Sequence, residues 1–348
     1  MSIFQLVKEH PLKFIISIAV SLVLIWFSFK DLEWEPFWLA IQSIKYGYLL
    51  LGAILLITSN IFRAVRWRIL LLPQKVVKRK QIFEAVMMGY MGNNVLPFKL
   101  GEVLRAMVVS KRHGIKISGV GASVVVERGL DIFSFLLLAG IYGAIYPSFE
   151  TARLLAQLAL AAIVLALFFG FWMNRNHDKY FGMIENWAGK MKETGHPKRG
   201  EHALALFHGL ETIWRMPKPI HVLWQTIVLW ALYFSITYLA VLAFGFGLSA
   251  GNLLEVAMIL MIFTTFSLSV PAAPGYVGTY HYAVIAALAL FGIENDAARA
   301  LAVVLHLMNY LIYTPIGAWY LVKAGLSLDL VADAPVDELN SPRDHIQN

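Results

Sequence analysis

Apolar residues occupy long uninterrupted runs in this chain, and short polar segments separate the runs. A helix needs ~20 predominantly apolar residues to cross the hydrocarbon of a bilayer, and several of the runs reach about that length. On this basis we predict six membrane-spanning helices, at residues 12–29, 47–71, 117–147, 151–173, 221–244 and 297–322.

Two further apolar regions, residues 81–110 and 252–292, are broken in the middle. In the first region the apolar stretch 82–96 is too short to span, and it runs into Pro97, which removes a backbone hydrogen bond from any helix. In the second region prolines and glycines exclude a helix over 271–275. We therefore predict a re-entrant pair of half-helices in each region. One pair is expected to open inward and the other outward, so an inverted repeat is our hypothesis for the fold, although the halves share no visible sequence identity.

Hydrophobic residues make up 59% of the chain and charged residues only 15%, which excludes an ordinary soluble protein and indicates an all-α polytopic membrane protein. The absence of cysteine excludes disulfides and thiol chemistry. The sequence also lacks a P-loop and the common nucleophile motifs. We therefore predict no ATP-driven work, no enzymatic activity, and no metal or other cofactor.

The formal net charge of +7 indicates membrane orientation and contact with anionic lipid rather than nucleic-acid binding. Residues 63–80, at the end of the second predicted span, hold many basic residues and no acid. By the positive-inside rule this end is cytoplasmic, which predicts an inner (plasma) membrane protein with both termini in the cytoplasm. Arg63 and Arg66 are expected to extend to the inner headgroups and to have no special role.

A single membrane domain is predicted over residues 1–325. Within it, residues 174–219 form a polar connection with amphipathic helical spacing, from which we expect surface helices on the inner leaflet. The acidic segment 326–348 is expected to be disordered. Membrane lipids are the expected partners, and a homo-oligomer is compatible with the sequence.

The first break concentrates polar groups at membrane depth, where they are costly and usually functional. A helix that restarts near residues 96–99 would direct free N–H groups and a positive dipole end into the membrane. Lys99 and Arg105 add positive charge, and Glu102 lies three residues from each, so it can pair with either on one helix face. This set favours a phosphate ligand, although mutual neutralisation of Glu102 and Arg105 stays open. The candidate residues are Asn93, Asn94, Lys99, Glu102 and Arg105.

Charged residues also occur inside the predicted span 117–147, at Glu127, Arg128 and Asp131. Glu127 and Asp131 are four residues apart and therefore share a helix face. Two interpretations stay open. The three residues form an internal ion network that fixes this helix to the first hairpin, or they form a titrating site or counter-charge that releases a bound phosphate.

In the second break, a helix that resumes at Gly278–Thr279 would again present its N-terminus to the membrane interior. The alternative is a kink lined by small residues for packing, which the density of prolines and glycines makes the weaker interpretation. His306 and Asn309 share a face of the last span, and a hydrogen-bonded structural histidine is favoured there over a proton relay. The candidate residues of this break are Gly275, Gly278, Thr279, Tyr280 and His281.

Three ordered motifs, Gly92–Arg105, Val126–Asp131 and Pro271–His281, resemble the lysylphosphatidylglycerol synthase transmembrane-region family, whose members are flippase-like integral membrane proteins. The resemblance covers about residues 10–323. It implies movement between leaflets of a lipid with a polar head, such as an aminoacyl-phosphatidylglycerol or a polyprenyl-phosphate-linked lipid, and it implies that the matching residues line the lipid path. Bifunctional members carry a soluble aminoacyltransferase domain after the membrane part. This sequence ends about 25 residues after its last predicted span, so we expect no lysyl-lipid synthesis.

From these observations we predict a lipid translocase in which Lys99 and Arg105 hold an anionic headgroup and Asn93 and Asn94 act as neutral donors. The acidic candidates would balance charge or titrate, and the second break would form the opposite gate. The alternatives are a membrane-embedded lipid-phosphate transferase or hydrolase, a secondary carrier of a small anion, and a scaffold that binds lipid without moving it.

Overall fold

The computed structural model describes residues 11–145, 175–195, 218–269 and 273–326, with isolated positions between 154 and 216 and at 328. Every regular element in these ranges is helical, which confirms the all-α polytopic class. The predicted span at 151–173 and the predicted acidic tail lie largely outside the described residues.

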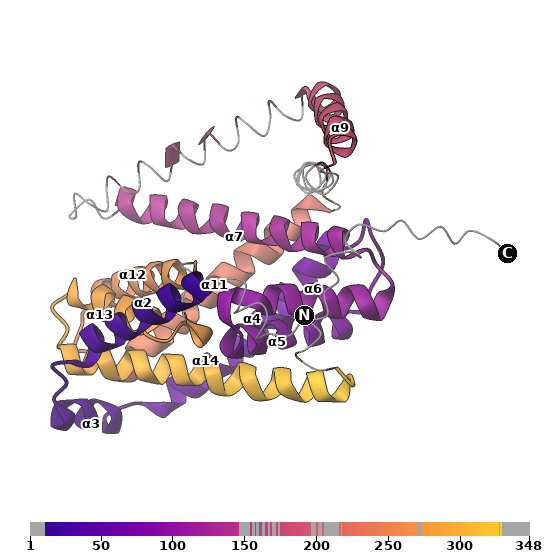
Figure 1. The fold of residues 1–348 in the computed structure, drawn as a ribbon. Helices are drawn as coiled ribbons and strands as arrows, with labels where there is room; N and C mark the ends of the chain where they lie inside the picture. Colours follow the sequence, from indigo (N-terminus) through magenta and orange to yellow (C-terminus); the bar gives the residue numbers. More distant parts are fainter. Residues whose placement is uncertain are drawn as a thin grey trace. The chain divides into compact units, whose positions relative to one another are not determined.

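The helices follow one another with short connections, and Figure 1 labels most of them. In chain order they are α2 (Pro11–Phe29), α3 (Trp34–Gln42), α4 (Tyr46–Leu70), α5 (Arg79–Val95), η1 (Pro97–Lys99), α6 (Leu100–His113), α7 (Ile117–Ile145), α9 (His177–Glu193), α11 (Pro219–Phe244), α12 (Ala250–Ser269), η2 (Pro274–Tyr276), α13 (Thr279–Ala289) and α14 (Asn295–Lys323).

Four described helices are long and apolar enough to cross a membrane: α4, α11, α14 and the Gly251–Leu268 part of α12. The bounds of α4, α11 and α14 agree with the predicted spans to within two residues. The structure differs from the prediction at α12, which was expected to be a half-helix. Its 20 residues extend over ~30 Å, about the thickness of the hydrocarbon. In the second hairpin only α13, with 11 residues, is short.

The order of helices is repeated along the chain. The series α4, α5, η1, α6, α7 has lengths of 25, 17, 3, 14 and 29 residues. The series α11, α12, η2, α13, α14 has lengths of 26, 20, 3, 11 and 29 residues. In both series a short helical turn that begins with proline separates two helices, and a long helix follows. This correspondence is what an internal repeat would produce, while the inversion of one copy relative to the other stays a prediction.

The chain divides into two compact units that interleave along the sequence. The first unit comprises Met1–Arg66, Arg79–Arg105 and Leu223–Ala332, and it contains both breaks. The second unit comprises Trp67–Lys78, Ala106–Val222 and Asp333–Asn348, and it contains α7 and α9.

The packing of α14 against α5 forms the centre of the first unit. A Cβ added at Gly317 of α14 would overlap Met91 and lie 2.5 Å from the carbonyl oxygen of Met87, so the two backbones are nearly in contact. Small residues permit this approach between membrane helices, because association there depends on close packing. Apolar side chains from four helices fill the adjoining core, which is centred on Leu56, Met87, Ile236 and Tyr313.

The end of α2 is fixed by Arg299 of α14, which is 5% exposed. Its Nε donates to the Ser28 carbonyl oxygen at 2.7 Å, and its guanidinium also donates to the Asp31 carbonyl oxygen at 2.9 Å. The last carbonyls of a helix have no partner within the helix, and Arg299 supplies one. Asp296 pairs with Arg299 at 2.5 Å and accepts the backbone N–H of Glu33, so a buried ion pair orients the segment between α2 and α3.

Polar contacts organise the described part of the second unit. Trp67 donates its indole N–H to Ser123 of α7 at 2.9 Å, and Lys75 donates to the His113 carbonyl oxygen at 2.7 Å. Gly119 lies against the amide of Gln74, where a Cβ would approach to 2.6 Å. These contacts connect the beginning of α7 to the 67–78 segment.

Candidate functional site

The two breaks have the same local backbone. Each turn begins with a proline, Pro97 or Pro274, and each has a glycine four residues later, Gly101 or Gly278. Each also contains two consecutive residues with left-handed backbone angles. The φ values are 57° at Phe98 and Lys99, 69° at Gly275 and 59° at Tyr276. A left-handed residue other than glycine costs about 1–2 kcal/mol, so the surrounding structure must hold these turns.

The two breaks lie in contact with each other. The Nζ of Lys99 is 5.9 Å from the centroid of the Tyr276 ring, a cation–π distance. A Cβ added at Gly275 would lie 3.3 Å from the carbonyl oxygen of Asn94, so Gly275 packs directly against the end of α5. The first unit thus brings together two segments that are about 175 residues apart in the sequence.

One face of α14 holds both breaks in position. The Nε2 of His306 donates to the Gly275 carbonyl oxygen at 2.7 Å, because a carbonyl can only accept. One turn later the Tyr310 ring contacts Gly275, and another turn later the Thr314 hydroxyl accepts the side-chain N–H of Asn94 at 3.0 Å. The interpretation of His306 as a hydrogen-bonded residue agrees with this geometry. Tyr310 and Thr314 were missed, although their spacings of four and eight residues from His306 place them on its face.

Close backbone packing surrounds Gly101 at the beginning of α6. A Cβ at this position would overlap the carbonyl oxygen of Gly89 and lie 2.5 Å from the backbone nitrogen of Asn93. The side-chain oxygen of Asn93 faces the same glycine, whereas Asn94 faces Thr314. The side-chain amides of Asn93 and Asn94, which were predicted to act together as donors, therefore face different residues.

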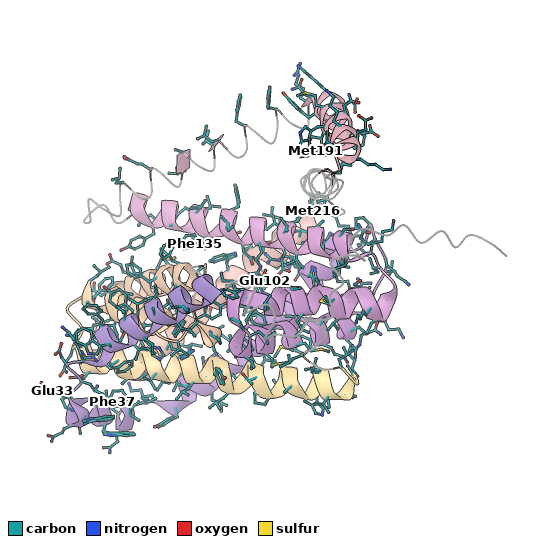
Figure 2. The ribbon with its side chains drawn as sticks, in the orientation of Figure 1. Glu33, Phe37, Glu102, Phe135, Met191 and Met216 are labelled. Atoms are coloured by element: carbon teal, nitrogen blue, oxygen red, sulfur yellow. The ribbon has the colours of Figure 1, made fainter. Side chains whose placement is uncertain are left out.

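The charged candidates of the first break differ in their surroundings. Arg105 is 3% exposed, and its aliphatic carbons pack against Gly89. Glu102 is half-buried on α6, where Figure 2 labels it. Lys99 precedes α6 and has a left-handed backbone, so the prediction that Lys99 and Glu102 share a helix face is wrong. The three-residue spacing applies to Glu102 and Arg105, which both lie in α6.

The polar groups of the second break bond to the break itself. Helix α13 resumes at Thr279 with Gly278 as its N-cap, as predicted. The Thr279 hydroxyl donates to the Tyr276 carbonyl oxygen at 3.1 Å, and the Nδ1 of His281 accepts the Gly278 N–H at 3.4 Å. Tyr280 stacks on His306 with a centroid distance of 5.6 Å. In this conformation these candidates stabilise the turn and do not project into open space.

Glu127, Arg128 and Asp131 lie in the second unit, on α7. Arg128 is 3.6 Å from Glu127 and 3.4 Å from Asp131, so one guanidinium lies between two carboxylates. Glu127 is fully buried. This arrangement agrees with an internal ion network, while a role in titration or in release of a phosphate stays a prediction.

The prediction that Arg63 and Arg66 extend to the headgroups is wrong. Arg63 is 4% exposed and Arg66 is fully buried in the first unit. Arg63 donates to the hydroxyl of Tyr233, and Arg66 donates to the hydroxyl of Thr226, both on α11. Sequence spacing places an arginine on a face but does not say whether lipid or another helix covers that face.

Metal binding finds no support in the described ranges, where no three histidine or acidic side chains lie close enough together to hold an ion.

Comparison with known proteins gives the following similarities. Residues 14–317 match the family described as lysylphosphatidylglycerol synthase TM region. A UPF0104 membrane protein of Methanothermobacter thermautotrophicus is 24% identical over 294 residues, which cover 80% of this chain and 86% of that protein. A UPF0104 membrane protein of Methanocaldococcus jannaschii is 24% identical over 298 residues, which cover 78% of this chain and 82% of that protein. No solved structure matches the chain.

Proposed function

The chain belongs to the lysylphosphatidylglycerol synthase transmembrane-region family, and on that premise we propose that it moves a lipid with a polar or anionic headgroup between the leaflets of a membrane. We place it in the inner (plasma) membrane with both termini in the cytoplasm, as the distribution of basic residues favours. The proposed movement involves no covalent chemistry.

The contact between Lys99 and Tyr276 carries this proposal. It provides a positive charge at the meeting point of two broken helices inside an integral membrane protein, where a charge is costly unless it faces a polar partner. Both side chains are half-buried, so part of each stays exposed. Helix α6 begins at the next residue, so the positive end of its dipole adds to the attraction for a phosphate.

The neighbouring residues suit the remainder of a headgroup. The amide of Asn94 is half-buried beside the junction and is held by Thr314. The aromatic ring of Tyr276 can cover the apolar part of the glycerol or an ammonium group, because aromatic faces attract cations. We propose that the headgroup phosphate contacts Lys99 while the acyl chains stay in the surrounding lipid.

Reconstitution tests the proposal. The protein is placed in vesicles of phosphatidylglycerol and phosphatidylethanolamine that carry one of these lipids with an acyl-linked NBD fluorophore, and dithionite then reports the exposed leaflet. We expect the wild type to expose inner-leaflet probe, and the Lys99→Gln variant to lose most of this activity. The Lys78→Gln variant is the matched control, because Lys78 is exposed and lies outside the breaks.

Three outcomes would contradict the proposal. A wild type that moves neither probe would show that these headgroups are not substrates. Release of a product from a labelled lipid phosphate would indicate an enzyme. Uptake of a water-soluble anion without lipid movement would indicate a carrier.

A further inference from the structure

A second polar cluster lies in the first unit, where residues of α4, α5, α11 and α14 pack together. We name it the Arg63 cluster. Its members are Asn60, Arg63, Tyr90, Tyr233 and Tyr313.

Arg63 contacts two tyrosines in this cluster, Tyr233 and Tyr90. Two of its nitrogens, Nε and one terminal nitrogen, donate to the Tyr233 hydroxyl at 3.2 and 2.8 Å. Its guanidinium carbon is 5.9 Å from the centroid of the Tyr90 ring. Tyr90 stacks in turn on Tyr313 with a centroid distance of 4.5 Å and an angle of 19°. Arginine recognises phosphate in a forked geometry and stacks on aromatic faces, so this environment suits an oxyanion bound beside it.

Asn60 adds a different binding property. It is 1% exposed, and its side-chain N–H groups donate to Tyr313 at 3.2 Å and to the Leu56 carbonyl oxygen at 2.7 Å. Its side-chain oxygen is buried and accepts no hydrogen bond from the described residues. A buried acceptor without a donor is unfavourable, so it is a group that a ligand hydroxyl or ammonium would satisfy.

The cluster is connected to the proposed headgroup site through the same two helices. On α14, Tyr313 is next to Thr314, which holds Asn94. On α5, Tyr90 lies one turn before Asn94 and therefore on the same helix face. Polar residues of the two sites thus lie within about one helical turn of each other on both α5 and α14.

On the basis of the function proposed above, we propose that the Arg63 cluster is a second headgroup site, which takes the phosphate of the lipid at Arg63 and a headgroup hydroxyl or ammonium at Asn60. The lipid class is therefore a phosphate-bearing lipid whose head carries a hydrogen-bond donor. Lys99 is half-buried in this structure and Arg63 is 4% exposed, so the first site is accessible while the second is closed. A headgroup that passes from one to the other needs the tyrosines to separate.

Removing only the hydroxyl distinguishes a role in lipid movement from a role in packing, because Tyr233→Phe and Tyr313→Phe keep the aromatic rings. Each is expected to lower the rate of NBD-lipid movement by about three- to tenfold, the effect of one hydrogen bond. Arg63→Gln is expected to lower the rate by roughly tenfold or more, since bonds to charged groups are stronger. The controls are Ser59→Ala, a buried hydroxyl bonded within its own helix, and Tyr282→Phe, an exposed tyrosine of α13.

A binding measurement provides the second readout. Native mass spectrometry of the purified protein with dioctanoyl phosphatidylglycerol reports lipid retention. We expect Lys99→Gln to lose retention and most of the movement, and the two tyrosine variants to keep retention and move lipid about three- to tenfold more slowly.

The outcomes distinguish the two proposals. A wild type that moves no lipid overturns the proposed function, and this inference falls with it. A wild type that moves lipid, together with Tyr233→Phe and Tyr313→Phe variants that move it at the wild-type rate, overturns only the second site and leaves the cluster structural. If Arg63→Gln does not fold, the tyrosine variants still decide the question.

Discussion

The two breaks share a backbone and differ in chemistry. Both have a turn that starts at proline, two left-handed residues and a glycine four positions after the proline. The two left-handed positions are Phe98 and Lys99 in the first break and Gly275 and Tyr276 in the second, so a lysine corresponds to a tyrosine. The side chains that follow the second turn bond to that turn and to α14. We conclude that the backbone of each break creates the interruption, and that of the two left-handed turns only the first carries a charged residue.

The largest expected effect tests the packing of the first break. In Gly101→Ala the new methyl group would overlap Gly89 and the backbone of Asn93, which cannot move without displacing α5. We expect a loss of stability of ~3 kcal/mol or more, seen as a large decrease in thermal stability in detergent. Gly52→Ala in α4, where nothing lies within 4 Å, is the control and should be neutral or slightly stabilising. Equal stability of the two variants would show that the hairpin is not closely packed at Gly101.

The second prediction concerns the lysine itself. Lys99→Gln removes a charged interaction of about 1.5–3 kcal/mol, so lipid movement should decrease by about 10- to 100-fold. Tyr276→Leu removes only the cation–π partner, which contributes about 0.5–2 kcal/mol, and should have the smaller effect. The initial rate in the dithionite assay measures both. A larger effect for Tyr276→Leu would mean that the aromatic ring, and not the charge, is the main binding group.

The third prediction concerns the support of the second break. His306→Ala leaves the Gly275 carbonyl oxygen without its donor and should destabilise the protein by about 1–3 kcal/mol. His306→Gln retains a donor of similar reach and should restore most of this loss. Hydrogen exchange of residues 273–278 should increase in the alanine variant. Unchanged exchange in both variants would show that the turn does not depend on α14.

The smallest expected effect concerns the difference in the side chains that the two left-handed turns tolerate. Gly275→Ala adds a methyl group 3.3 Å from the Asn94 carbonyl oxygen at a φ of 69°, so we expect a loss of about 1–2 kcal/mol. The corresponding position in the first turn accepts Phe98. Thermal denaturation of Gly275→Ala measures the difference, and an unchanged midpoint would show that the two turns tolerate side chains equally.

The sequence predicted where helices begin and end better than it predicted which residues of different helices contact one another. Prolines and glycines placed both breaks and the start of α13, because these residues act on the local backbone. Lys99 was assigned to the face of α6, because spacing does not reveal a left-handed residue before the helix. The burial of Arg63 and the role of Thr314 were missed for another reason. A helical pattern identifies a polar face, but the helix that covers this face is known only once the chain is folded.

The near contact of α5 and α14 at Gly317 has a consequence for the route of a lipid. Two backbones at this distance leave no width for a fatty-acid tail between them. In the proposed function, the hydrocarbon part of the lipid would therefore stay outside this pair of helices, and only its polar end would enter the protein. The rate of lipid movement would then depend on the headgroup and not on the length or unsaturation of the fatty-acid tails.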